Sequence, residues 1–383
     1  MKSILSKYFK GDVVIWGLIL LLSVYSILAV YSSTGTLAFK TQDGDTFFFL
    51  FRHTGLLLTG VAIIFFTHLI PFQYFSRLSQ LLLFISIPLL AWTLFQGTSL
   101  NEASRWLTLP VKGLSFQTSD LAKIALIMFI ARFLAQNQDN VHDFNKGFRN
   151  IMIWIIVVCG LILPANFSTA AILFATSMFI LFIGRISFKY LLSVFLIGVT
   201  GVTIFIVIML NLPEDKQGRI GTWKNRIESF SQDNDEDNFQ VTQAKIAIAT
   251  GGFIGKGPGN STQRNFLPHP YSDFIFAIII EEYGLIGGFF LLFIYLTIFY
   301  RAGMIARKID SAFGVFVTIG LAFSLVFQAL INMAVAVNLL PVTGQTLPLV
   351  SMGGTSLLFT GAALGIILSV SRNVKIPLSD EKA

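Results

Sequence analysis

The chain has 383 residues, of which 54% are hydrophobic and only 12% are charged, with a mean hydropathy of +0.74. A soluble globular domain carries roughly a quarter of its residues as Asp, Glu, Lys or Arg, so this composition excludes that class. The net charge of +7 comes from basic residues scattered between apolar runs, which membrane topology explains without nucleic acid. The single cysteine, Cys159, excludes an internal disulfide.

Apolar runs long enough to cross a bilayer predict about ten transmembrane helices. The first run is too long for a cleaved signal peptide and lacks a small-x-small exit, so we expect it to be retained. An even number of crossings puts both termini on one side, and the distribution of Lys and Arg favours N-in and C-in. We therefore expect one all-α, polytopic membrane domain over residues 1–383. Its helices are predicted near residues 13–33, 48–68, 79–96, 119–135, 150–164, 169–184, 187–211, 273–299, 312–336 and 352–371.

One long loop, residues 212–272, separates the seventh and eighth predicted helices and is expected to be extracytoplasmic. Its acidic run at 233–237 is expected to face water, whereas 239–252 has the pattern of an amphipathic helix in the membrane interface. The glycines between 251 and 259 predict irregular backbone. This stretch is not a phosphate-binding P-loop, because Lys256 is not followed by Ser or Thr and no strand precedes it.

Ionisable residues in or beside apolar helices are candidate functional groups because burying them is costly. Asp120 and Lys123 are three residues apart and share one face of the fourth helix. They could form a simple salt bridge at a helix start capped by Thr118 or Ser119, or a functional pair. Arg52 lies within the second helix, where it needs a partner or a wet cavity, and a lipid pyrophosphate could be that partner.

Asp273 is predicted to open the eighth helix, where either capping or catalysis would explain it. Ser272 can cap the helix, and an Asp in the first turn is favoured by the helix dipole. Glu281 and Glu282 lie roughly two turns deeper, where capping cannot explain them. They could bind a neighbouring basic side chain or stay protonated. The four histidines show no metal-ligand spacing.

The segment from Leu340 to Ser356 carries two prolines and three glycines between the last two predicted helices. Irregular backbone at membrane depth is tolerated only where it is buried in protein or lines a cavity. The segment is therefore either a structured outer segment of that kind or a simple helix break.

Together these segments resemble the SEDS family, the FtsW, RodA and SpoVE group of peptidoglycan glycosyltransferases. Residues 105–107 are similar to the family's Arg-Trp-Ile/Leu, and 116–123 to its Phe-Gln-Pro-Ser-Glu-Leu-Ala-Lys. Residues 272–277 are similar to its Thr-Asp-Phe-Ile-Phe-Ala, and 281–284 and 340–356 also match. The chain departs from the family at four positions, where Asp120 replaces Glu, Thr118 Pro, Tyr271 His and Met352 Tyr. A role that requires imidazole at position 271 is thereby excluded.

The resemblance implies that the chain polymerises lipid II into glycan, releasing undecaprenyl pyrophosphate, with Asp273 as general base. Positive charge for the pyrophosphate could come from Arg52, Arg105 or Lys123. A divalent cation, Mg²⁺ or Mn²⁺, could assist, although no protein cage is visible in the sequence. The substrate-binding residues that we expect are Arg52, Arg105, Asp120, Lys123, Gln243, Lys256, Glu282 and Ser351.

Residues 332–335 and 259–261 look more like the cell-division member of the family than the elongation member, RodA. This implies a class B penicillin-binding transpeptidase of the FtsI kind and other division proteins as partners, at the septal cytoplasmic membrane of a bacterium. The alternatives are an elongation polymerase, a lipid II transporter and a non-catalytic scaffold. Asp273 at a helix mouth and the lack of an inverted repeat disfavour transport, and the retained carboxylate disfavours a scaffold.

Overall fold

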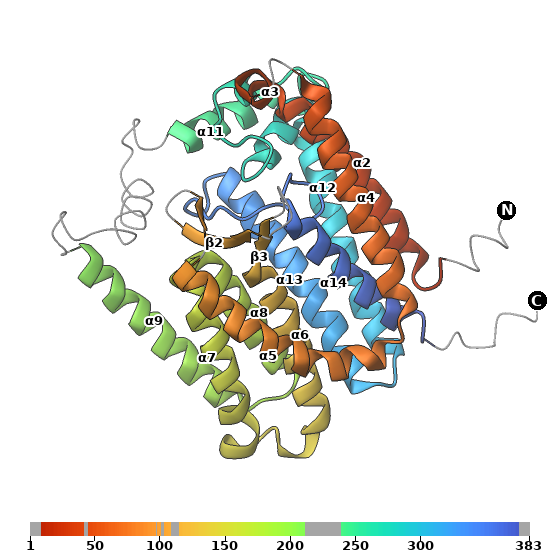
Figure 1. The fold of residues 1–383 in the computed structure, drawn as a ribbon, viewed down its shortest axis with the longest axis vertical. Coiled ribbons are helices and arrows are strands. Elements are labelled where there is room, and N and C mark those ends of the chain that lie inside the picture. Colours follow the sequence, from red (N-terminus) through yellow and green to blue (C-terminus); the bar gives the residue numbers. More distant parts are fainter. Residues whose placement is uncertain are drawn as a thin grey trace, which may run out of the picture.

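The structure is a computed structural model that describes residues 9–41, 45–96, 98–100, 103–108, 115–210 and 239–374 (Figure 1). The acidic run predicted at 233–237 lies outside these residues. All ten predicted helices are confirmed. They are α2 (Val13–Ser33), α4 (Thr46–Leu69), α5 (Phe72–Gln96), α6 (Thr118–Gln136), α7 (Asn150–Ile162), α8 (Phe167–Ile183), α9 (Phe188–Leu210), α12 (Ile275–Lys308), α13 (Ala312–Ala336) and α14 (Thr355–Ser371).

Several short elements were not predicted. A three-stranded antiparallel sheet, β1 (Thr98–Leu100), β2 (Ala103–Thr108) and β3 (Ser115–Gln117), replaces the loop expected around Arg105. It departs from the purely helical prediction because strands of only three to six residues leave little periodic pattern in a sequence. The others are a short helix, α3 (Gly35–Thr41), a π-helical turn, η2 (Phe144–Arg149), and two 3-10 turns, η1 (Gln138–Asn140) and η4 (Gln263–Asn265). The amphipathic helix predicted at 239–252 is α11 (Phe239–Gly251).

The chain is a multi-pass membrane protein. Among the described residues, six helical spans are long and apolar enough to cross a membrane, and three shorter apolar helices accompany them. The two ends of the described chain meet, because the backbone N–H of Asp12 donates to Ser371 Oγ over 3.0 Å. The start of α2 and the end of α14 therefore lie side by side at one end of the bundle. Arg301 of α12 forms an ion pair with Asp12 at the same end of the bundle.

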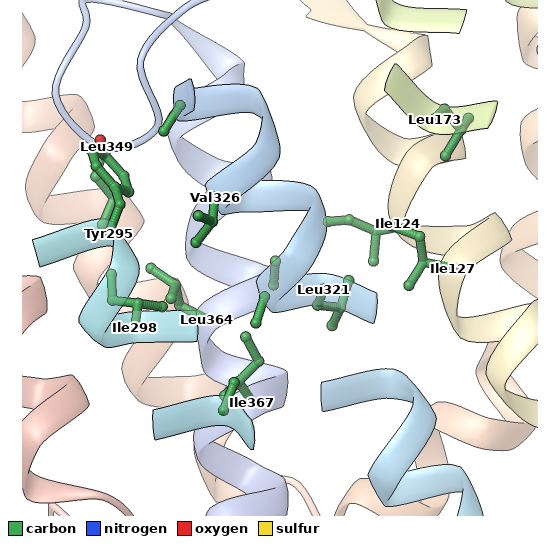
Figure 2. Packing of buried hydrophobic residues seen from close by; sticks show 14 of the residues in the cluster. Ile124, Ile127, Leu173, Tyr295, Ile298, Leu321, Val326, Leu349, Leu364 and Ile367 are labelled. Atoms are coloured by element: carbon green, nitrogen blue, oxygen red, sulfur yellow. The ribbon is translucent and has the colours of Figure 1, made fainter. Parts of the chain in front are cut away.

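Helix α13 lies at the centre of the bundle, in contact with α6, α8, α12 and α14. Figure 2 shows Leu321 of α13 facing Ile127 of α6, with Tyr295 and Ile298 of α12 on the other side of α13. Beside this core, α4 and α14 approach closely at two glycines. A Cβ on Gly361 would lie 2.6 Å from the carbonyl oxygen of Gly60, so only glycine fits there.

The segment between α13 and α14, residues 337–354, is irregular but largely packed inside the protein. Leu347, Leu349 and Val350 are buried, and the Tyr295 hydroxyl donates to the carbonyl oxygen of Pro348 over 2.5 Å. This agrees with the prediction of a structured segment, since irregular backbone in a membrane protein needs protein partners. We call residues 337–354 the strap.

Candidate active site

Asp273 lies in the turn that precedes α12 and not in the helix itself. Helix α12 begins at Ile275, and its N-cap is Phe274, which makes no side-chain capping bond. The prediction that Asp273 opens the helix under a Ser272 cap is therefore wrong. The Ser272 hydroxyl instead donates to Asp273 Oδ1 over 2.9 Å. This bond orients the carboxylate rather than the helix.

The strap holds the turn at 271–273 through two hydrogen bonds, and a third bond within the strap fixes the Ser351 hydroxyl. The Ser351 hydroxyl donates to the carbonyl oxygen of Ser272 over 2.7 Å and accepts from the N–H of Leu347 over 2.8 Å. The N–H of Met352 donates to the carbonyl oxygen of Tyr271 over 2.9 Å. Ser351, predicted to bind substrate, is thus placed one residue from Asp273 as a support for its backbone.

Asn332 of α13 ties Asp273 to the strap. Its Nδ2 donates to the carbonyl oxygens of Asp273, at 2.9 Å, and of Gln345, at 2.7 Å. The Gln345 side chain donates in turn to Thr169 Oγ1 of α8 over 2.9 Å. One buried amide therefore fixes the distance between the backbone of Asp273 and the strap.

Asp120 and Lys123 form the predicted salt bridge, with 2.8 Å between Oδ1 and Nζ. Neither Thr118 nor Ser119 caps α6, because the helix begins at Thr118 and its N-cap is Gln117, without a side-chain capping bond. Lys123 also donates to Gln328 Oε1 of α13 over 3.2 Å.

Gln328 links this pair to the strap and to the turn of Asp273. Its Nε2 donates to the carbonyl oxygen of Thr346 over 2.9 Å. Gln328 and Asn332 are four residues apart, so they share one face of α13 about one turn apart. Lys123 and Asp273 are therefore bound at successive turns of the same face. Lys123, Asp120 and Gln328 line a cavity between α6, α13 and α14 that Ser324, Ser356 and Thr360 also border.

Helix α12 is broken at Gly284, which has a φ of 70° and a ψ of −175°. The loop after α11 replaces the helical hydrogen bonds lost there. The N–H groups of Lys256 and Gly257 donate to the carbonyl oxygens of Glu281 and Glu282, both over 2.9 Å. A Cβ at Gly284 would lie 2.2 Å from the carbonyl oxygen of Phe253. Glycine is thus required both by the conformation and by this close approach.

The carboxylate of Glu281 is fully committed to the same loop. It accepts from Lys256 Nζ at 2.6 Å, from the Thr262 N–H at 3.1 Å and hydroxyl at 2.9 Å, and from the Ser261 hydroxyl. Of the two alternatives offered by the sequence, the structure shows Glu281 bound to a basic side chain, Lys256. Glu282 accepts from the Ser32 hydroxyl of α2 and the Ser261 N–H. Lys256 and Glu282 thus help to hold the loop after α11 against the break in α12. Their predicted contact with substrate stays a prediction.

Three other predicted residues lie elsewhere. Arg52 is exposed on the surface of α4, and its predicted contact with a lipid pyrophosphate stays a prediction. Gln243 is half-buried on α11, and Arg105 lies in β2, with its side chain outside the described residues. Within the part of the chain that the structure describes, no hydrogen bond or ion pair joins Arg52 or Gln243 to the turn of Asp273.

Tyr271 stands beside Asp273 at the position where the resemblance expects histidine. Burial raises the pKa of its phenol above the usual 10, and the negative charge of Asp273 raises this pKa further. The phenol therefore keeps its proton at neutral pH, and its oxygen lies 3.3 Å from His269 Nδ1.

Gln328, Asn332 and Gln345 were missed by the sequence reasoning. Two polar amides four residues apart on an otherwise apolar helix were the pattern that could have revealed the first two.

The described residues contain no group of three or more His, Cys, Asp or Glu side chains arranged to hold a metal ion. The predicted Mg²⁺ or Mn²⁺ stays a prediction.

Comparison with known proteins gives a consistent family. The family model of cell cycle proteins that covers FtsW, RodA and SpoVE matches residues 12–376. A probable peptidoglycan glycosyltransferase FtsW from Trichlorobacter lovleyi is 32% identical, with 100% of each chain covered. Stage V sporulation protein E of Bacillus subtilis is 33% identical, over 96% of this chain and 98% of that protein.

Two solved structures share the fold. The rod shape determining protein RodA of Thermus thermophilus has a TM-score of 0.66 at 24% identity, covering 97% of this chain and 99% of that one. A chain of a peptidoglycan synthase complex that coordinates polymerization and crosslinking has a TM-score of 0.70 at 24% identity, covering 94% and 98%.

Proposed function

Because the chain belongs to the FtsW, RodA and SpoVE family and is a peptidoglycan glycosyltransferase, we propose that it polymerises lipid II with Asp273 as general base. In this reaction a sugar hydroxyl of the acceptor gives its proton to the Asp273 carboxylate as its oxygen attacks the anomeric carbon of the donor. The bond from that carbon to the pyrophosphate breaks, and undecaprenyl pyrophosphate leaves with the electron pair. Attack from the face opposite the leaving group inverts the anomeric centre.

The observation that carries this proposal is the rigid support of Asp273. A catalytic base must be held within a fraction of an ångström of its working position. Asn332 binds the carbonyl oxygen of Asp273, Ser351 binds that of Ser272, and the Ser272 hydroxyl orients one carboxylate oxygen. A turn that only connected two helices would not need such support from α13 and the strap.

Lys123 is our candidate to receive the pyrophosphate. It lies one turn of α13 away from the support of Asp273, and its own side chain borders the cavity between α6, α13 and α14. Asp120 neutralises Lys123 in this structure, so phosphate oxygens would have to compete with that carboxylate. Negative charge develops on the leaving pyrophosphate in the transition state, and this charge strengthens the attraction between Lys123 and the phosphate oxygens.

We place the protein in the cytoplasmic membrane of a bacterium, N-in and C-in, at the division septum. The meeting of Asp12 with Ser371, and Arg301, Arg307 and Lys308 at the same helix end, support this orientation. The names of the FtsW relatives favour division over elongation. The resemblance of the fold to a chain of a peptidoglycan synthase complex supports a class B penicillin-binding transpeptidase as partner.

The test is glycan polymerisation from labelled lipid II by purified wild type and Asp273→Asn, each with and without the transpeptidase. We expect polymer from wild type and none from a folded Asp273→Asn protein. Equal polymer from both would move the base elsewhere. No polymer from either, even with the partner, would favour the transporter or scaffold alternative.

A further inference from the structure

The loop that fills the break in α12 carries two exposed apolar side chains. Phe253 and Ile254 are 76% and 80% exposed, although the loop is held by backbone bonds to α12. A loop that lay in water would gain nothing from displaying them. Figure 1 shows this segment beside the end of α12, next to α11.

The position of the loop along α12 can be read from its hydrogen bonds. The N–H of Ile286 donates to the carbonyl oxygen of Phe253, so Phe253 lies level with Ile286 along the axis of α12; we call this position along the axis their height. Ile286 is also the first residue of an exposed apolar stripe on α12. The stripe continues through Phe289, Phe290, Phe293, Leu296 and Tyr300, whereas Ile275 to Ile280 are all buried in the protein.

This height corresponds to the interior of the membrane. Ile286 lies 15 residues before Arg301 (301 − 286), about 22 Å along the axis at 1.5 Å per residue. The ion pair of Arg301 with Asp12 marks one boundary of the hydrocarbon core, since charged pairs gather at that boundary. A core about 30 Å thick then extends roughly 8 Å beyond Ile286.

The polar groups of the loop agree with this depth. The Lys256 ammonium group turns back onto Glu281, and Glu281 is fully buried with hydrogen bonds from Ser261, Thr262 and Gln263. Where water is excluded, a charged group must be paired and hydrogen-bonded by protein. The loop thus pairs these charged groups itself. Phe253 and Ile254 are its exposed apolar side chains, whereas its exposed polar residues, Asn260 and Thr262, lie further along the chain.

We propose that Phe253 and Ile254 insert into the leaflet nearest the active-site turn and contact lipid acyl chains. This lipid contact anchors the clamp loop, residues 251–263, at the broken helix. With this contact, the exposed apolar stripe of α12 extends onto the clamp loop, although the sequence of that loop is polar enough to suggest that it lies in water. The inference is independent of the role of Asp273.

The test uses spin labels on the full chain reconstituted in phospholipid vesicles. Cys159 is the only native cysteine and is buried, so Cys159→Ala gives a background for Phe253→Cys and Ile254→Cys. Phe293→Cys, on the exposed stripe of α12, is the lipid reference, and Asp139→Cys, in the exposed turn after α6, is the water reference. Collision of each label with oxygen, which concentrates in hydrocarbon, is compared with collision with a water-soluble nickel chelate.

We expect the ratio of oxygen to nickel collisions at Phe253→Cys and Ile254→Cys to exceed that at Asp139→Cys by about fivefold or more, approaching Phe293→Cys. A ratio equal to that at Asp139→Cys would place the loop in water and overturn the proposal. Low collision with both reagents would also overturn it, because the two side chains would then be covered by protein, such as a second copy of the chain. Size-exclusion elution identical to wild type shows that each labelled protein is folded.

Discussion

Replacing Asn332 should slow the chemical step more than it weakens binding of lipid II. Asn332→Ala removes two buried hydrogen bonds, to the carbonyl oxygens of Asp273 and Gln345. Each bond contributes about 1 kcal/mol, so we expect a loss of roughly 2–3 kcal/mol in unfolding free energy. Loss of the tether also lets the turn of Asp273 move. A displacement of about 1 Å in a catalytic group costs on the order of 100-fold in rate.

The assay is steady-state polymerisation of labelled lipid II, with kcat and KM measured separately and thermal melting run beside them. We expect kcat to fall about 100-fold while KM changes less than about threefold, since the tether positions the base and does not hold substrate. Asn332→Asp, which keeps the shape but replaces the donor by an acceptor, should behave like Asn332→Ala.

Thr169→Val is the matched control. It removes the bond from Gln345 on the far side of the strap and leaves the bond from Asn332 to Asp273 intact. It should destabilise by about 1 kcal/mol and keep most of kcat. If Asn332→Ala keeps wild-type kcat, or if Thr169→Val loses as much, Asn332 is a packing residue and the positioning argument is refuted.

Three further outcomes are expected. Gly284→Ala should lower the free energy of unfolding by at least about 2 kcal/mol and lower the melting temperature, because the new Cβ would lie 2.2 Å from the carbonyl oxygen of Phe253 in the clamp loop. Gly303→Ala is the control in the same helix. It should leave the melting temperature unchanged, because no atom lies within 4 Å of the new Cβ. Lys256→Met should destabilise by about 3 kcal/mol by leaving the buried Glu281 carboxylate without its cation, and Lys256→Met with Glu281→Gln should recover part of that loss in the same melting assay. The N–H groups of Lys146 and Asn145 lower the pKa of Asp143, so its stabilising contribution is present above the unfolded pKa near 3.9 and is lost as the pH falls through the lower folded value. Asp143→Asn should therefore lower the melting temperature at pH 7 but not at pH 2; a constant difference would contradict that linkage.

The ten helices could be predicted because each is a nearly continuous apolar run that a bilayer requires. The Asp120–Lys123 pair could be predicted because its partners are three residues apart on one helix. Other contacts join residues that only the tertiary structure brings together. Asn332 and Asp273 are 59 residues apart, and Lys256 and Glu281 are 25 apart, and no local pattern selects such pairs.

The break in α12 escaped prediction for a related reason. Gly284 sits inside the predicted eighth helix, where a single glycine is compatible with continuous helix. What breaks the helix is the clamp loop, whose N–H and carbonyl groups replace the lost helical bonds. The sequence predicted irregular backbone at the glycines of that loop, but its partner lay in a helix that was expected to be regular.

These irregular segments explain where the candidate site is built. Backbone outside regular helix is costly at membrane depth, so each irregular segment must find its hydrogen-bond partners in another. The clamp loop pairs with the break at Gly284, and the strap pairs with the turn at 271–273. The N–H of Met352 and the carbonyl oxygen of Tyr271 join two positions at which the sequence differs from the motifs that the resemblance expects. Because the bond uses backbone groups, side-chain changes at 271 and 352 that keep the N–H of residue 352 leave this support of the Asp273 turn available.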